Sequence, residues 1–199
     1  MAEVRSLIWL AQNAEDVASG LHLFRDQLPR DATWITTIIG ELFAVSSVLR
    51  KLDNAQLHPR DQPSFYRIKD DLALVFPSLR DTLDACLDMF RRAKDRPHQM
   101  VWDDLNHLME SVEGASLEER LQWYHDMLQD LYELLDGVRS NRLDLLRRKI
   151  VRLDSAQNEA TTGRQRRPVE RPVSGSCTHF SFPTSLHMRF YIDIGRGID

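Results

Sequence analysis

Cysteine, glycine and proline are scarce in this sequence. Its 199 residues include two cysteines, eight glycines and eight prolines. Two cysteines cannot supply the disulfide framework of a small secreted domain, and this scarcity favours a reducing compartment. None of the glycines stands in a GxxxxGK[ST] or GxGxxG motif, so neither type of phosphate-binding loop is encoded. We therefore expect no disulfide bond and no nucleotide site.

Short motifs of other enzyme classes are absent as well. The sequence has no GxSxG nucleophile elbow, no CxxC pair and no HExxH helix. Its first apolar run, residues 7–11, is too short for a secretory signal and follows Glu3 and Arg5. These absences argue against hydrolysis of nucleotides, hydride transfer, zinc proteolysis and secretion. We expect a cytoplasmic protein, with a nuclear location left open.

Positive charge is scarce in the larger part of the chain. Residues 1–160 hold 20 basic and 27 acidic side chains, whereas residues 161–199 hold six basic and three acidic ones. An acidic body argues against a broad nucleic-acid-binding face, so we expect no nucleic-acid partner. The basic C-terminal part could act separately.

What the sequence does contain is helical periodicity. Apolar residues recur at intervals of three and four, and prolines and glycines punctuate the pattern. SLEE at 116–119 has the form of a capping box, and Asp136-Gly137 forms a stop signal. Pro77 lies inside one segment, which is either one kinked helix or two nearly collinear ones. Six helical segments are predicted: 4–28, 32–54, 65–90, a shorter one between Pro97 and Gly114, 117–135 and 141–158.

The most apolar stretch is ITTIIGELFAVSSVL, residues 35–49, in which Glu41 is the single charge. We predict that this segment is the central helix of a bundle, with Phe43 and Val48 extending its apolar face on either side. As a membrane span it is too short, and it carries Glu41, Gly40 and four hydroxyl side chains.

The periodicity ends after residue 158. We predict an all-α fold, an antiparallel bundle of five to six helices over residues 1–158, followed by a basic, largely disordered tail at 159–199. Residues 180–194 are apolar enough for a short strand or a docking segment. Truncation after residue 158 should leave the fold intact.

Three groups of polar residues are candidate chemical sites. Asp103 and His107 stand one helical turn apart, as metal ligands can, but they lie off the predicted apolar face. Asp70-Asp71 and Glu118-Glu119 fall in the first turns of helices, where carboxylates complement the helix dipole. His125, with Trp34, Trp102 and Trp123, could line a ligand pocket, although packing explains these residues more simply. We predict no catalytic, cofactor-binding or metal-ligating residues.

The last helix is basic. Residues 139–154 contain six Lys and Arg against two Asp, and Arg148, Lys149 and Arg152 are predicted to share an outer face. Three interpretations stay open. In the first the basic face complements the acidic body, in the second it contacts anionic lipid head groups, and in the third it acts with RQRR (164–167) as an import or nucleic-acid-contacting cluster.

Three stretches carry a resemblance. ELFAVSSVLRKLD (41–53), YRIKDDLALVFPSLRDTLD (66–84) and LEERLQWYHDMLQDLYELL (117–135) resemble an all-helical domain of filamentous fungi, related to the N-terminal domains of fungal STAND-type signalling NTPases. The resemblance covers residues 1–158 and implies a helical bundle used for protein contact or signal relay, near the death-domain type that can attack membranes. The chain lacks the nucleotide-binding module of those NTPases. The resemblance brings no catalytic residues with it.

Together these patterns predict a non-enzymatic, intracellular protein–protein interaction or signalling-adaptor domain. Amphipathic helices can bind other helices in the way that they bind each other. One alternative is a membrane-active bundle that binds anionic lipid through the basic last helix, or by releasing residues 35–49 or 4–14. A second alternative is an enzyme with an unrecognised site near Asp103, His107 and His125.

Overall fold

The described residues form a helical bundle. The computed structural model describes residues 4–57, 62–92, 97, 100–104, 106, 114–138 and 140–165, and within these ranges the regular structure is helical, with no strand. This confirms the all-α prediction. The long helices are α1 (Val4–Arg25), α2 (Ala32–Leu57), α3 (Gln62–Arg92), α5 (Leu117–Leu135) and α6 (Leu143–Gln165).

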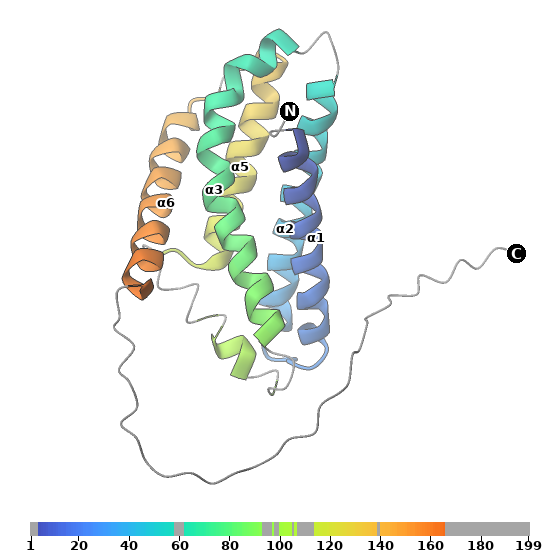
Figure 1. The fold of residues 1–199 in the computed structure, drawn as a ribbon. Coiled ribbons are helices and arrows are strands. Elements are labelled where there is room, and N and C mark those ends of the chain that lie inside the picture. The colour runs from blue at the N-terminus through green and yellow to red at the C-terminus, as the bar shows by residue number, and fades with distance from the viewer. Residues whose placement is uncertain are drawn as a thin grey trace, which may run out of the picture. The chain divides into compact units, whose positions relative to one another are not determined.

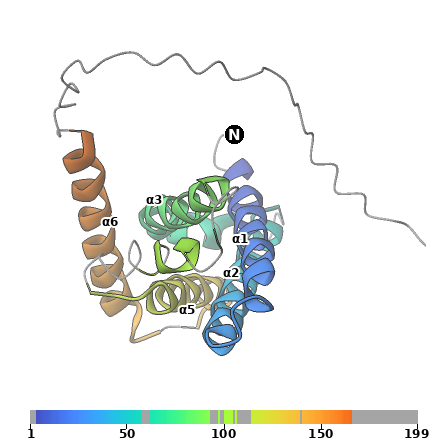
Figure 2. The ribbon, with the colours of Figure 1, turned by 90° about the horizontal axis from the view of Figure 1, so that it is seen from below.

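Consecutive long helices run in opposite directions, as Figure 1 shows. Four of them form a ring in which α1 packs on α2 and α3, and α5 packs on α2 and α3. The last long helix, α6, packs mainly on α3 and α5, on the side of the bundle away from α1 and α2 (Figure 2). As a result α3 is the helix that touches all four others.

The core is built from the predicted apolar faces. In α2 the residues Ile35, Ile38, Leu42 and Leu49 are buried against α1, α3 and α5. One detail of the prediction was wrong, because Phe43 is 46% exposed and lies outside the core. The apolar face of α2 is therefore narrower than its composition indicates.

The length of α2 also differs from the prediction. At 26 residues, α2 is long and apolar enough to cross a membrane by length and composition alone. It ends at Leu57 and not at the predicted residue 54. Of its most apolar 18-residue window, 44% is buried inside the bundle.

Pro77 does not divide α3. A single helix runs from Gln62 to Arg92 with Pro77 inside it, which agrees with the first of the two predicted alternatives. Because Pro77 has no backbone N–H, the carbonyl of Ala73 lacks its i+4 helical donor. The helix begins earlier than predicted because Pro63 falls in its first turn, where the missing N–H costs nothing.

Both predicted ends of α5 are confirmed. Ser116 caps the first turn by accepting from the Glu119 N–H at 3.2 Å, and Glu119 accepts in return from the Ser116 N–H at 2.9 Å. At the other end Gly137 has φ +83°, and the N–H of Val138 donates to the carbonyl of Glu133. This is a Schellman termination, which needs a left-handed residue after the helix.

The last helix is longer than predicted. Ala160 to Gln165 continue α6, so the structural boundary falls later than the predicted one at 158. The chain divides into two units at residues 1–166 and 167–199. Of the predicted tail, 159–199, residues from 166 onward lie outside the described part of the chain, and so does the predicted docking segment 180–194.

Candidate functional site

The predicted metal-like pair is only half described. Asp103 is exposed, next to the buried Val101 and Trp102, as expected for a residue off the apolar face. His107 lies outside the described residues. Among the residues that are described, no group of three or more His, Cys, Asp or Glu side chains is placed to hold a metal ion.

The two carboxylate pairs have different roles. Glu119 closes the capping box, and its hydrogen bond from the Ser116 backbone lowers the pKa of Glu119. Asp71, in contrast, is buried and receives two hydrogen bonds from Arg147 of α6, at 2.6 and 2.7 Å. The prediction that Asp71 is a solvated first-turn carboxylate was wrong. With Arg147 it forms an inter-helix clasp, an ion pair that joins α3 to α6. The hydrogen bonds that Arg147 donates to Asp71 raise the pKa of Arg147.

His125 of α5 lies opposite Glu41, the single charged residue of the apolar stretch 35–49. Its Nδ1 lies 3.6 Å from Oε2 of Glu41, and each side chain keeps between a quarter and a third of its surface exposed. Oε2 of Glu41 is a buried atom without a hydrogen-bond partner. The pair joins α2 to α5 electrostatically when the imidazole is protonated.

The tryptophans are packing residues. Trp34 of α2 meets the buried Trp102 edge to face, with ring centroids 4.6 Å apart. Trp123 of α5 lies under the ammonium group of Lys149, 4.2 Å from Nζ to the ring centroid. The structure does not bring His125 and the three tryptophans into one pocket among those described.

Sequence reasoning missed a buried polar network. Ser78 Oγ donates to Oε1 of Gln157 at 2.7 Å, so its own lone pair is left for the hydroxyl of Tyr124, also at 2.7 Å. Nε2 of Gln157 donates to Thr82 Oγ1 at 2.9 Å. The network joins α3, α5 and α6, and burial raises the pKa of Tyr124. The sequence does carry a signal for this network. Gln157 lies one helical turn after the inward residue Leu153, and Thr82 lies one turn after Ser78.

A charged side chain is buried beside this network. Arg120 of α5 is 1% exposed, and burial lowers its pKa, with Tyr124 and Cys86 as the nearby ionisable groups. Burial also raises the pKa of Cys86 to about 12, so its thiol stays protonated at neutral pH. The inward faces of α3, α5 and α6 therefore carry polar and charged side chains as well as apolar ones.

Most of the basic residues described in the last helix and the turn before it have intramolecular partners. Arg142 donates to the buried Asp130 at 2.8 Å, and Arg147 pairs with Asp71 and Asp144. Lys149 lies over the Trp123 ring. It therefore does not share the outer face that was predicted for Arg148, Lys149 and Arg152. Arg148 and Arg152 stay exposed, near the exposed Leu145 and Val151. This arrangement agrees with the interpretation that basic side chains complement an acidic body.

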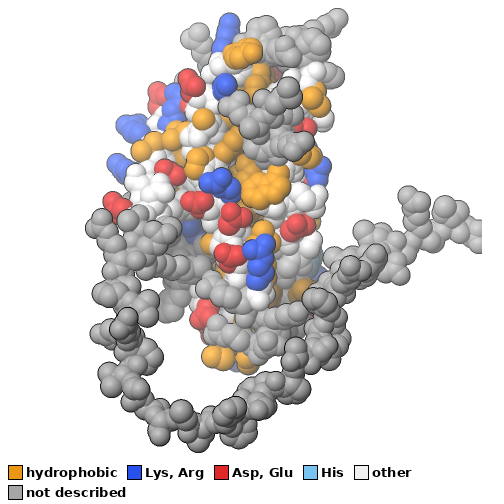
Figure 3. Space-filling view, viewed as in Figure 1, with side chains coloured by type: hydrophobic (Ala, Val, Ile, Leu, Met, Phe, Trp, Pro, Cys, Tyr) orange, Lys and Arg blue, Asp and Glu red, His pale blue; other side chains and the backbone are white. Residues whose placement is uncertain are grey.

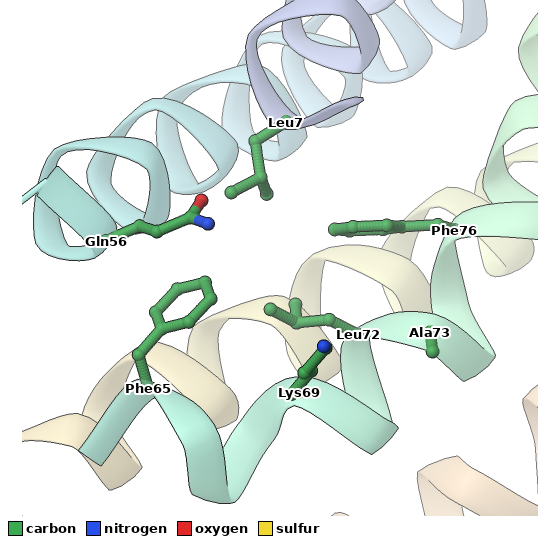
Figure 4. Close-up of a pocket in the computed structure, with 7 residues that line it drawn as sticks. All are labelled: Leu7, Gln56, Phe65, Lys69, Leu72, Ala73 and Phe76. Carbon is green, nitrogen blue, oxygen red and sulfur yellow. The ribbon is translucent and has the colours of Figure 1, made fainter. Parts of the chain in front are cut away.

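A pocket opens at the end of the bundle where α1 and α3 begin and α2 ends. Figure 4 shows Gln56 entering it from α2, Leu7 from α1 and Phe76 from α3. Its space is about 40 Å³, well below the range of small-molecule sites. Oε1 of Gln56 is buried without a hydrogen-bond partner. The lining residues are Leu7, Gln56, Phe65, Lys69, Leu72, Ala73 and Phe76.

Apolar surface continues from this pocket over α1 and α3. We call this surface the α1–α3 face and define it by Trp9, Tyr66, Ala73 and Phe76. Tyr66 is 75% exposed, Trp9 is 45% exposed, Ala73 is exposed and Phe76 is partly buried. Figure 3 shows hydrophobic side chains gathered on this side of the molecule, flanked by charged groups of both signs. Such a surface can bind an apolar partner.

Comparisons of the chain with protein families, with curated proteins and with solved structures found no match. Function must therefore be argued from the arrangement of these residues.

Proposed function

We propose that this chain is a non-enzymatic helical module that works by binding another protein. The α1–α3 face carries the proposal. Aromatic side chains that a bundle core would normally bury are exposed there beside a small apolar pocket. Amphipathic helices and aromatic anchors commonly bind in such grooves.

The distribution of polar groups supports a structural use for them. Glu15 of α1 binds Arg50 of α2 through two hydrogen bonds of 2.9 Å, and Asp130 binds Arg142 at the α5–α6 turn. With the pair between Asp71 and Arg147, these clasps use charges to join helices. A catalytic site would instead gather reactive groups around a substrate-sized space.

The resemblance to N-terminal domains of fungal STAND-type signalling NTPases is consistent with this proposal. It would make the module an intracellular adaptor or relay for a larger signalling assembly. The proposal itself depends on the surface and not on the resemblance.

Affinity capture of the full chain from extract of its native cells tests the proposal. Tyr66→Asp places a charge on the α1–α3 face, and Val151→Asp places one on an exposed apolar residue of α6. We expect the same bound protein with the native chain and with Val151→Asp, and loss of that protein with Tyr66→Asp. Equal recovery by all three chains, or recovery by none, would contradict the proposal.

A second candidate function is contact with an anionic membrane through α6. Arg148 and Arg152 point outward with Leu145 and Val151, a pattern of basic and apolar residues that suits a lipid surface. Co-sedimentation with vesicles containing phosphatidylserine at low salt tests it. We expect binding that Arg148→Gln with Arg152→Gln reduces and that Arg67→Gln, on α3, leaves unchanged. Absence of binding at low salt removes this candidate.

A further inference from the structure

The last helix is held on the bundle by little apolar surface. Among the side chains of α6 that the structure describes, 143–159, the buried apolar ones are Leu146, Ile150 and Leu153. On α2, which is three residues longer, nine apolar side chains are buried. Because burial of apolar surface is the main favourable contribution to packing, α6 gains much less from its contact with the bundle than α2 does.

Polar side chains fill much of the contact between α6 and α3. Asp71, Ser78 and Thr82 of α3 are buried there, and so is Gln157 of α6. Arg147 donates to Asp71, and Gln157 accepts from Ser78 and donates to Thr82. When such surfaces separate, water can replace these hydrogen bonds, whereas it cannot replace apolar contacts. Interfaces that form and dissociate are accordingly more polar than permanent ones.

The turn before α6 is fastened separately, to α5. Ser140 Oγ donates to Oδ2 of Asp130 at 2.6 Å, and Nη2 of Arg142 donates to Oδ1 of Asp130 at 2.8 Å. These partners are 10 and 12 residues apart in sequence, whereas the bonds from Arg147 and Gln157 to α3 span 76 and 79 residues. The local bonds can therefore stay in place while α6 moves away from α3, with the turn at 136–142 as the hinge.

We propose that α6 is a reversibly opening helix, which leaves α3 and α5 as one unit while the other four long helices stay folded. The ring of four helices is closed without α6, because α6 lies outside it (Figure 2). Opening uncovers Asp71, Ser78 and Tyr124, a polar surface that differs from the α1–α3 face. This device goes beyond the proposed function, which does not depend on it.

Native-state hydrogen exchange of the full chain at pH 7, followed by NMR, tests the inference. The exchange rate of each amide gives the equilibrium constant of the opening that exposes it. We expect the amides of residues 147–158 to share one opening constant, larger by about tenfold or more than that of residues 38–52 in α2. The reason is that a detached helix of 23 residues retains little helical structure in water.

Two substitutions separate opening of α6 from opening of the whole bundle. Asp71→Asn removes a contact that only the closed form has, so it should raise the opening constant of α6 about tenfold. Ser46→Ala is the matched control, because Ser46 bonds to Glu15 between α1 and α2, a contact that the open form retains. It should raise the opening constant of α2 and leave that of α6 unchanged.

Four outcomes would overturn the inference. Equal opening constants for α2 and α6 in the native chain would mean that α6 opens only with the whole bundle. Acceleration of α6 by Ser46→Ala would mean the same. Protection that declines steadily from residue 147 to residue 158 would show fraying from one end instead of movement as a unit. No change of α6 in Asp71→Asn would show that the ion pair with Arg147 does not hold the helix closed.

Discussion

Arg147 of α6 holds Asp71 of α3 through two parallel hydrogen bonds, 2.6 Å from Nε to Oδ1 and 2.7 Å from Nη2 to Oδ2. The third nitrogen of the same guanidinium reaches Asp144 at 2.7 Å. Because α6 packs mainly on α3 and α5, this fork is one of the polar attachments that fix the last helix on the bundle.

Removal of the Asp71 charge should loosen α6. Asp71→Asn leaves a partly buried guanidinium without its counter-charge, and we expect a loss of about 1–3 kcal/mol in the free energy of unfolding, reduced from the fully buried case because Arg147 is partly exposed. Urea denaturation measures it. The control is Asp70→Asn, an exposed neighbour, which should change stability by less than about 0.5 kcal/mol. Equal effects of the two substitutions would contradict the clasp.

The buried network predicts that removal of the Tyr124 hydroxyl group lowers the stability of the fold. Tyr124→Phe keeps the ring in place but leaves Ser78 and Thr82 without the hydroxyl that they contact at 2.7 and 3.1 Å. We expect a loss of about 1–2 kcal/mol in the free energy of unfolding, the usual cost of a buried group left unsatisfied. Tyr132→Phe, on the partly exposed side of α5, serves as the control in thermal and urea unfolding. If both substitutions are neutral, the hydroxyl of Tyr124 does not join the three helices.

The helices could be predicted from sequence because apolar spacing and capping residues act locally. SLEE at 116–119 and Gly137 predict both ends of α5, and the apolar stripe on both sides of Pro77 predicts that its two halves share one inward face. The apolar residues Leu128 and Ile150 are buried for the same reason. Each of these features depends on neighbours within one or two turns.

The polar interior could not be predicted because it depends on which helices become neighbours. Asp71 and Gln157 look like surface residues until α6 packs on α3, and their partners are 76 and 79 residues away in sequence. The pocket has the same origin, since Leu7, Gln56 and Phe76 come from three helices. Sequence periodicity identifies which face of a helix is inward, but not which helix it will meet.

The clasp between α1 and α2 should make stability depend on acid. The hydrogen bond from Ser46 Oγ to Glu15 Oε1, at 2.5 Å, is the main cause that lowers the pKa of Glu15, and Arg50 adds to it. A lowered folded-state pKa contributes stability above the unfolded-state value of 4.5, and this contribution is lost as pH falls through the folded-state value. Acid should therefore weaken the attachment of α1 to α2.

Ser46→Ala tests this dependence. We expect a loss of about 1 kcal/mol in the free energy of unfolding at pH 7, and a smaller difference from the native chain at pH 3, because protonation of Glu15 begins to remove the charge that Ser46 stabilises. Ser47→Ala, one residue along and exposed, is the control at both pH values. A difference of the same size at pH 3 and pH 7 would mean that Ser46 acts through packing and not through the Glu15 carboxylate.

Cys86 should make the fold sensitive to alkali. Its thiol ionises near 9.0 when unfolded, whereas burial raises the folded-state pKa to about 12. Between these values the unfolded chain releases a proton that the folded chain retains, so the free energy of unfolding falls as pH rises, by about 1.4 kcal/mol per pH unit for this one group. In Cys86→Ala the decline measured by urea denaturation between pH 9 and 11 should be shallower by about that slope. A Cys177→Ser background leaves Cys86 as the only thiol, and in it a thiol reagent at pH 8 should react only after unfolding. Parallel declines in the two chains, together with rapid labelling of the folded protein, would show that this cysteine is accessible to solvent.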